Sequence, residues 1–142
     1  MDVNELALVY KRYYDSDYRI FFVSGHDEKL IEIVNAKEYN GNQNFGTYVL
    51  IAKNKKNKIR LVSLNYEELG IIEFSLTELA GEKLHDWTNY LKSTIRYLKE
   101  AGYQINHGMD LLICGNIPNE VGLSSSTSIE ALTAVIIKSL YR

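Results

Sequence analysis

The chain has 142 residues, 16 Lys and Arg against 18 Asp and Glu, and one cysteine. This length suffices for one hydrophobic core without a disulfide or metal, so we expect residues 1–142 to form a single domain. A net charge of -2 offers no general affinity for nucleic acid or for an anionic membrane. The sequence shows neither an apolar run long enough to span a bilayer nor a signal peptide, and its lone cysteine cannot form an internal disulfide, so we expect a cytoplasmic protein.

The first half of the chain predicts a helix followed by strands. Apolar side chains at helical spacing predict a short amphipathic helix over residues 5–14. Runs of β-branched and aromatic residues predict strands over residues 19–23, 29–34, 48–52 and 59–63. A lysine-rich stretch, residues 53–58, joins the last two strands; it suits a solvated hairpin tip better than an anion-binding patch.

The second half predicts a strand over residues 72–76 and a helix over residues 83–100, with Trp87 on its apolar face and Gly102 as its C-cap. Residues 109–114 are apolar on nearly both faces, which indicates a buried strand, and a capping box formed by Thr127 and Glu130 opens the last helix. The order of elements predicts an α+β fold, a mostly antiparallel sheet with helices on one side.

A loop rich in Gly and Ser, residues 115–128, connects this strand to the last helix. Free backbone N–H groups at the positive end of a helix dipole suit a phosphate. Gly and Ser also satisfy turn and cap geometry without any ligand, so the bare pattern leaves both interpretations open. The loop is not a Walker A loop, because no Gly-Lys-Ser/Thr follows the glycines.

The whole string from Pro118 to Glu130 resembles the second, nucleotide-binding motif of the GHMP small-molecule kinases, and among them that of galactokinases. Residues 63–66, 86–90 and 100–111 are similar to the stretches that precede this loop in bacterial galactokinases. The resemblance implies a GHMP kinase N-terminal domain, whose fold is like domain 2 of ribosomal protein S5. It implies Mg-ATP as cofactor, with Ser126 as a magnesium contact and nucleotide contacts from Pro118, Asn119, Gly122, Leu123, Ser124, Ser125, Ser126 and Ser128.

Two positions of the loop depart from the family pattern. Glu120 stands where the family usually has glycine, and Val121 stands where it has a small residue. A carboxylate near bound phosphates repels them, and a β-branched side chain restricts the backbone of the loop. We therefore expect both departures to weaken the binding of ATP.

The first motif of galactokinases, which grips the sugar, survives here only at its end. Counting back from that end places Ala36, which can grip no hydroxyl, at a sugar-binding histidine of the family. Counting forward from Phe21 gives an alignment that differs by three residues, so the polar set is incomplete on either count. The resemblance therefore implies a degenerate sugar-binding segment that contains Glu38, Tyr39, Asn40 and Gly41.

The activity implied by the resemblance is ATP-dependent phosphorylation of galactose to galactose 1-phosphate, with ATP and galactose as the partners. In the family the catalytic aspartate and a third glycine-rich motif lie beyond the phosphate loop. Phosphoryl transfer depends on several groups acting at once, so we expect no catalytic residue in this chain and no turnover by it alone. A non-catalytic module that binds nucleotide, sugar or protein is an alternative, and a remnant without function is another.

Other candidate residues have structural interpretations. Asp86 and Asp110 are structural by family position, and Cys114 on its apolar strand is expected to be an inert core thiol. The three histidines are far apart and show no metal-binding spacing.

The last helix has a second apolar side, with Val135 and Ile137, which predicts a central helix and not a superficial one. The resemblance implies that a further portion of the family's proteins covers this helix, so we expect apolar residues such as Val135, Ile136, Ile137 and Leu140 to be exposed in this chain, which predicts self-association or a partner chain.

Overall fold

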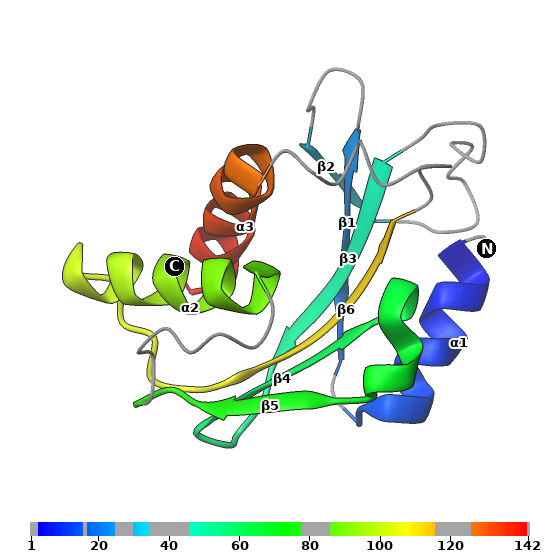
Figure 1. Ribbon diagram of the computed structural model, residues 1–142, viewed down its shortest axis with the longest axis horizontal. Helices are drawn as coiled ribbons and strands as arrows, with labels where there is room; N and C mark the ends of the chain where they lie inside the picture. Colours follow the sequence, from blue (N-terminus) through cyan, green and yellow to red (C-terminus); the bar gives the residue numbers. More distant parts are fainter. Residues whose placement is uncertain are drawn as a thin grey trace.

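The computed structural model describes residues 3–15, 17–24, 30–34, 46–77, 86–115 and 126–141. These residues form three helices, a short 3-10 helix and six strands (Figure 1). In chain order they are α1 (Val3–Tyr13), β1 (Arg19–Ser24), β2 (Leu30–Ile33), β3 (Gly46–Lys53), β4 (Lys58–Ser63), η1 (Leu64–Leu69), β5 (Ile72–Ser75), α2 (Asp86–Glu100), β6 (Met109–Gly115) and α3 (Ser126–Leu140).

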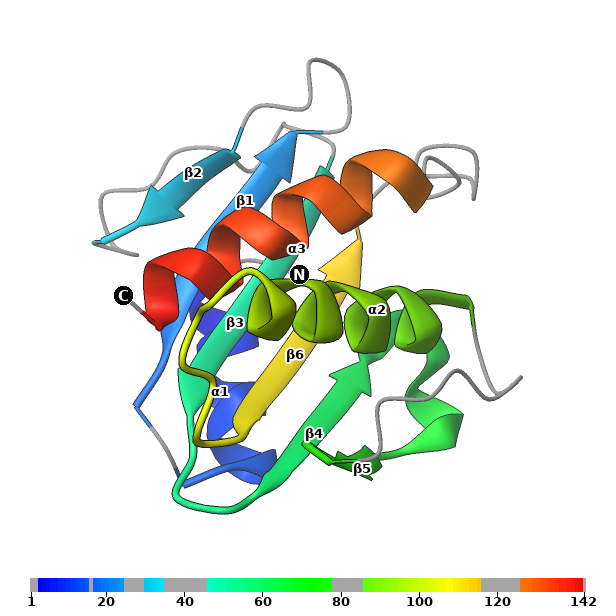
Figure 2. The same cartoon turned by 90° about the vertical axis from the view of Figure 1, so that its left-hand side faces the viewer.

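The six strands form one sheet with the order β2-β1-β3-β6-β4-β5 (Figure 2). All neighbouring strands are antiparallel except β4 and β6, which run parallel. The sheet and the α-helices confirm the predicted α+β class. Every strand and α-helix expected from the sequence is present with shifted bounds, and η1 is an addition that the sequence pattern did not predict.

Helices cover both faces of the sheet, as Figures 1 and 2 show. One core joins the sheet to α2 and α3 through residues such as Ile51, Ile95 and Ile136. A second core on the opposite face joins the sheet to α1 through residues such as Leu6 and Leu50. The expectation of helices on one side therefore holds for α2 and α3 and is wrong for α1. The reason is that β1, β3, β4 and β6 contribute buried apolar side chains to both cores, so both faces need a cover.

The last helix is central, as its two apolar sides predicted, and the expected exposure of its apolar residues is mostly wrong. Ile136 and Ile137 are 2% and 0% exposed and belong to the core shared with α2, and Leu140 is partly buried against it. Of the four residues expected at the surface, Val135 alone is exposed, at 49%. The predicted exposure of Ile136 and Ile137 is wrong because α3 packs against both the sheet and α2, so its apolar surface is wide and inward-facing.

Helix α2 ends in the predicted glycine cap. Gly102 has a φ of 101°, a left-handed conformation that favours glycine. Its N–H donates to the carbonyl of Lys99 at 3.1 Å, and the N–H of Tyr103 donates to the carbonyl of Leu98 at 3.0 Å. These two bonds form a Schellman motif, which turns the chain toward β6. The start of the predicted helix, residues 83–85, and the side chain of Trp87 lie outside the described residues.

Thr94 on α2 is buried, and its hydroxyl has no hydrogen-bond partner among the residues that the structure describes. Replacing Thr94 by Val removes an unsatisfied hydroxyl while keeping the branched shape. We expect Thr94→Val to raise the free energy of unfolding by about 1 kcal/mol, measured by urea denaturation. Thr77 is exposed and its hydroxyl lies 2.8 Å from that of Ser75, so Thr77→Val is the control and should not stabilise the protein. A lower free energy of unfolding for Thr94→Val would contradict the finding that the Thr94 hydroxyl has no hydrogen-bond partner.

Candidate functional site

Ends of the strands β1, β3 and β6 lie side by side. This row of strand ends is called an edge of the sheet here, and it is distinct from the edge strands β2 and β5. Ser24 at the end of β1 pairs with Gly46 at the start of β3, and Thr47 pairs with Gly115 at the end of β6. A Cβ on Gly46 would collide with the carbonyl oxygen of Val23, so only glycine permits this approach of β1 and β3. The segment with the predicted sugar residues leads into Gly46, and the segment with the predicted phosphate loop leaves from Gly115. The sheet therefore brings together one end of each motif.

The position of α3 places its N-terminus toward the same edge. Its C-terminal end is held at the opposite edge, where the Tyr141 hydroxyl donates to the carbonyls of His107 at 2.7 Å and Gly108 at 2.9 Å. The helix has 15 residues, which corresponds to about 22 Å and is close to the length of β6. The N-terminal end of α3 thus lies toward the end of β6 that carries Gly115 (Figure 2). The positive end of the helix dipole lies at that end.

Most of the predicted site residues lie outside the described residues. Pro118, Asn119, Gly122, Leu123, Ser124 and Ser125 fall in this group, with the departures Glu120 and Val121 and the sugar residues Glu38, Tyr39, Asn40 and Gly41. Ser126 and Ser128 belong to the first turn of α3, but their side chains are outside the description too. Their roles therefore stay predictions. The structure describes the strands and the helix that these segments connect.

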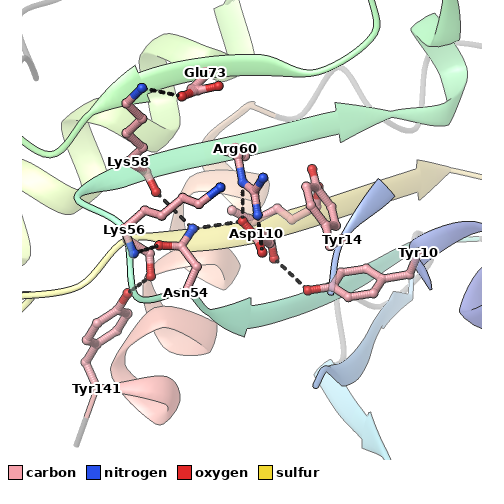
Figure 3. Close-up of polar contacts among 11 residues, drawn as sticks. Tyr10, Tyr14, Asn54, Lys56, Lys58, Arg60, Glu73, Asp110 and Tyr141 are labelled. Carbon is pink, nitrogen blue, oxygen red and sulfur yellow. Dashed lines mark hydrogen bonds and ion pairs between the residues drawn. The ribbon is translucent and has the colours of Figure 1, made fainter. Parts of the chain in front are cut away.

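Asp110 lies near the start of β6, at the end of the strand away from Gly115, and is fully engaged in structural contacts (Figure 3). It is 1% exposed, and its carboxylate accepts from Arg60 Nε at 2.8 Å and from Arg60 Nη2 at 2.9 Å. The amide of Asn54 also donates to it at 2.8 Å. Such a carboxylate is a structural residue, as family position implied. Asp86 begins α2, and its side chain lies outside the described residues.

Tyr10 of α1 and Tyr14, which directly follows α1, close the polar cluster around Asp110 (Figure 3). The hydroxyl of Tyr14 donates to the carbonyl of Leu111 at 2.8 Å, and that of Tyr10 points to the carbonyl of Asp110 at 3.4 Å. Burial raises the pKa of Tyr14, and the charge of Asp110 raises it further. The phenol therefore stays protonated and remains a donor to β6. These contacts attach α1 to the central strand.

The lysine-rich hairpin tip has ordinary surface contacts. Lys58 pairs with Glu73 at 2.9 Å with both side chains exposed, and Lys55 and Lys56 are exposed as well. A hollow of about 400 Å³ lies beside the tip, with a lining that includes Lys58, Glu73 and Arg60. Of its cations, Lys58 and Arg60 already have carboxylate partners. The contacts favour the solvated interpretation of this tip.

Two further observations concern the described part of the chain. It contains no group of three or more His, Cys, Asp or Glu residues that could hold a metal ion. None of its helices is long and apolar enough to cross a membrane.

Cys114 lies on β6, next to the edge that carries both motifs. Its side chain is partly buried and packs against the core under α1. Burial raises the pKa of its thiol. A thiol with a raised pKa holds less of the reactive thiolate at neutral pH, so the contacts agree with an unreactive core cysteine.

Comparison with known proteins points to one family. The family model described as GHMP kinases N terminal domain matches residues 89–142. The galactokinase of Fusobacterium nucleatum is 42% identical over 135 residues, which cover 91% of this chain and 34% of that protein. The galactokinase of Staphylococcus carnosus is 49% identical over 110 residues, or 73% of this chain and 28% of that protein.

Solved structures agree with the sequence matches. The crystal structure of Lactococcus lactis galactokinase complexed with galactose matches with a TM-score of 0.69 and 30% identity, covering 96% of this chain and 37% of that chain. The Methanococcus jannaschii mevalonate kinase matches at a TM-score of 0.52 and 17% identity, which shows a shared fold. This chain thus spans about a third of the length of the relatives it matches.

The fold, the strand-loop-helix edge and these matches define the class: the chain is an N-terminal domain of the GHMP kinase superfamily. Within that superfamily it is galactokinase-like and corresponds to the N-terminal part of those proteins.

We expect Asp110→Asn to lower the free energy of unfolding by about 3 kcal/mol, because it breaks a buried ion pair. Urea denaturation followed by circular dichroism measures this change. Glu73→Gln breaks the exposed Lys58–Glu73 pair and is the matched control, with an expected loss below about 1 kcal/mol. An equal loss in the free energy of unfolding in both variants would contradict the conclusion that the buried Asp110 pair stabilises the fold more than the exposed Lys58–Glu73 pair.

We expect Cys114 to react with iodoacetamide at pH 8 more slowly than free cysteine, because burial raises its pKa and lowers the thiolate fraction. Mass spectrometry of the alkylated chain over time measures the rate, and the chain unfolded in urea is the control in which the rate should return to that of free cysteine. A native rate equal to the unfolded rate would show that the thiol is not shielded.

Proposed function

We propose that this chain supplies the phosphate-binding and sugar-binding segments of a galactokinase-like phosphotransferase. The observation that carries the proposal is the shared edge of the sheet, where Gly46, Gly115 and the N-terminal end of α3 come together. The similarity to galactokinases supports the choice of galactose and ATP as ligands. In the whole protein the reaction is phosphorylation of galactose by ATP to galactose 1-phosphate.

The phosphate-binding segment of this proposal is residues 118–128. Its contacts are Pro118, Asn119, Gly122, Leu123, Ser124, Ser125, Ser126 and Ser128. The start of α3 fits a polyphosphate, because the first N–H groups of a helix have no intrahelical acceptor and the helix dipole favours negative charge there. Ser126 is the proposed magnesium contact, and magnesium neutralises charge on the transferring phosphoryl group.

The sugar-binding segment of the proposal contains Glu38, Tyr39, Asn40 and Gly41. It leads into β3 at Gly46, beside the strand that leads into the phosphate segment. This arrangement suits a reaction that must hold two substrates next to each other. The incomplete set of polar residues gives weak sugar binding, because each missing hydroxyl partner lowers affinity and discrimination.

We further propose that the chain does not turn over by itself, and that it acts in the cytoplasm as a single domain. Phosphoryl transfer needs a group to orient the nucleophile and several groups to hold the phosphates. The described carboxylate of β6, Asp110, lies at the opposite end of that strand and is committed to Arg60 and Asn54. A non-catalytic module that binds nucleotide, sugar or protein is the alternative, and the incomplete sugar motif beside the retained serine-rich segment favours it.

The test is isothermal titration of the purified chain with a non-hydrolysable Mg-ATP analogue, with and without galactose. We expect micromolar to low-millimolar binding that Ser126→Ala weakens about tenfold or more, because it removes the proposed magnesium contact. Ser75→Ala on β5 is the matched control and should bind like the unaltered chain. The absence of heat and of a thermal shift with either ligand would refute the proposed site, and phosphorylation of galactose by the chain alone would refute its inactivity.

A further inference from the structure

Arg19 lies where the edge strand β2 leaves the sheet. In the pairing of β1 with β2, Ile20 is opposite Ile33, so Arg19 stands at the end of the pairing and reaches diagonally to Glu32. The chain then continues through Val34 into residues 35–41, called the sugar segment below. The side chain of Arg19 therefore lies next to the point where the sugar segment begins.

The guanidinium of Arg19 grips Glu32 with two hydrogen bonds. Nε donates to Oε2 at 2.9 Å and Nη2 donates to Oε1 at 2.7 Å. This two-point geometry is the strong form of an ion pair, and lysine cannot reproduce it. The hydrogen bond from Arg19 lowers the pKa of Glu32, so the carboxylate stays charged at neutral pH.

The same guanidinium also binds the last turn of α3. Nη2 donates to the hydroxyl of Ser139 at 2.9 Å, and Nη1 donates to its backbone carbonyl at 3.3 Å. A carbonyl in the last turn of a helix has no acceptor role within the helix, and a cation at this end opposes the negative end of the dipole. Arg19 therefore donates hydrogen bonds to the C-terminal end of α3 as well as to the carboxylate of Glu32 on β2.

These contacts join two elements that lead to different parts of the proposed site. Strand β2 is at the edge of the described sheet and pairs there only with β1, over four residues. Helix α3 begins at Ser126, within the phosphate-binding segment of residues 118–128. Arg19 thus connects the strand that precedes the sugar segment to the helix whose first turn ends the phosphate-binding segment. Its side chain uses Nε, Nη1 and Nη2 together for this purpose.

We propose that Arg19 is a positioning residue that holds the end of β2 and the last turn of α3 in one fixed relative arrangement. The meaning of this role for ligands rests on the proposed function. The mechanical role itself rests only on described contacts. Loss of these contacts leaves β2 attached through its pairing with β1 and through the packing of Leu30, so the protein remains folded while the two elements loosen.

The test is hydrogen exchange of the backbone amides, followed by mass spectrometry, in Arg19→Gln. We expect protection of residues 30–34 and of residues 136–141 to fall together by about tenfold, while residues 91–100 keep their protection. Ser139→Ala removes the side-chain bond to α3 and keeps the Glu32 pair, so it should cause a smaller loss in the same two segments. A merely structural role would lower protection everywhere by one factor.

The matched control is Glu73→Gln, which breaks a comparable exposed ion pair with Lys58 on the opposite edge strand β5. That pair has no bond to a helix among the contacts of the described residues, so its loss should leave residues 30–34 and 136–141 unchanged. A uniform loss in Arg19→Gln, or a loss in residues 30–34 with α3 unchanged, would overturn the proposal. Because the exchange needs no ligand, its failure is distinct from a failure of the nucleotide titration.

Discussion

The central strand β6 constrains the rest of the structure. It is hydrogen-bonded to β3 on one side and to β4 on the other, and its side chains are buried on both faces of the sheet. Leu111 contributes to the core under α2 and α3, and Leu112 contributes to the core under α1. A strand of this kind has no face left for water, so a helical layer on each side follows from it.

One polar group interrupts this apolar strand, and its contacts specify how the neighbours are placed. Asp110 pairs in register with Arg60 on β4 and binds Asn54 at the start of the β3–β4 connection. A buried carboxylate is costly unless ion pairing and hydrogen bonds satisfy it, so shifting β4 by one residue would leave both charges unpaired. Tyr14 then attaches α1 to the same strand. The parallel pairing of β4 and β6 is therefore held by charge as well as by packing.

The same arrangement explains why Gly46, the first described residue after the predicted sugar motif, and Gly115, the last described residue before the predicted phosphate loop, lie at one edge of the sheet. Residues far apart in the chain, Gly46 and Gly115, reach that edge because β3 and β6 are adjacent and antiparallel. The rigid sheet carries the connecting segments, and binding residues on such segments are common in proteins. At the opposite ends of these strands, Arg19 joins Glu32 of β2 to Ser139 in the last turn of α3. The galactokinase-like class of the chain gives these segments their proposed ligands.

The sequence by itself determined the elements, the α+β class, the cap at Gly102 and the family, because periodicity, cap residues and motif spacing are local properties. It also pointed to the segments of the candidate site, whose side-chain roles still rest on the motif resemblance. Only the tertiary structure decided that α1 covers the opposite face, that Ile136 and Ile137 are buried, and that Arg19 meets Ser139. The physical reason is that a hydrophobic pattern shows which side of an element avoids water, but not which neighbour covers it. That choice depends on contacts between residues distant in sequence.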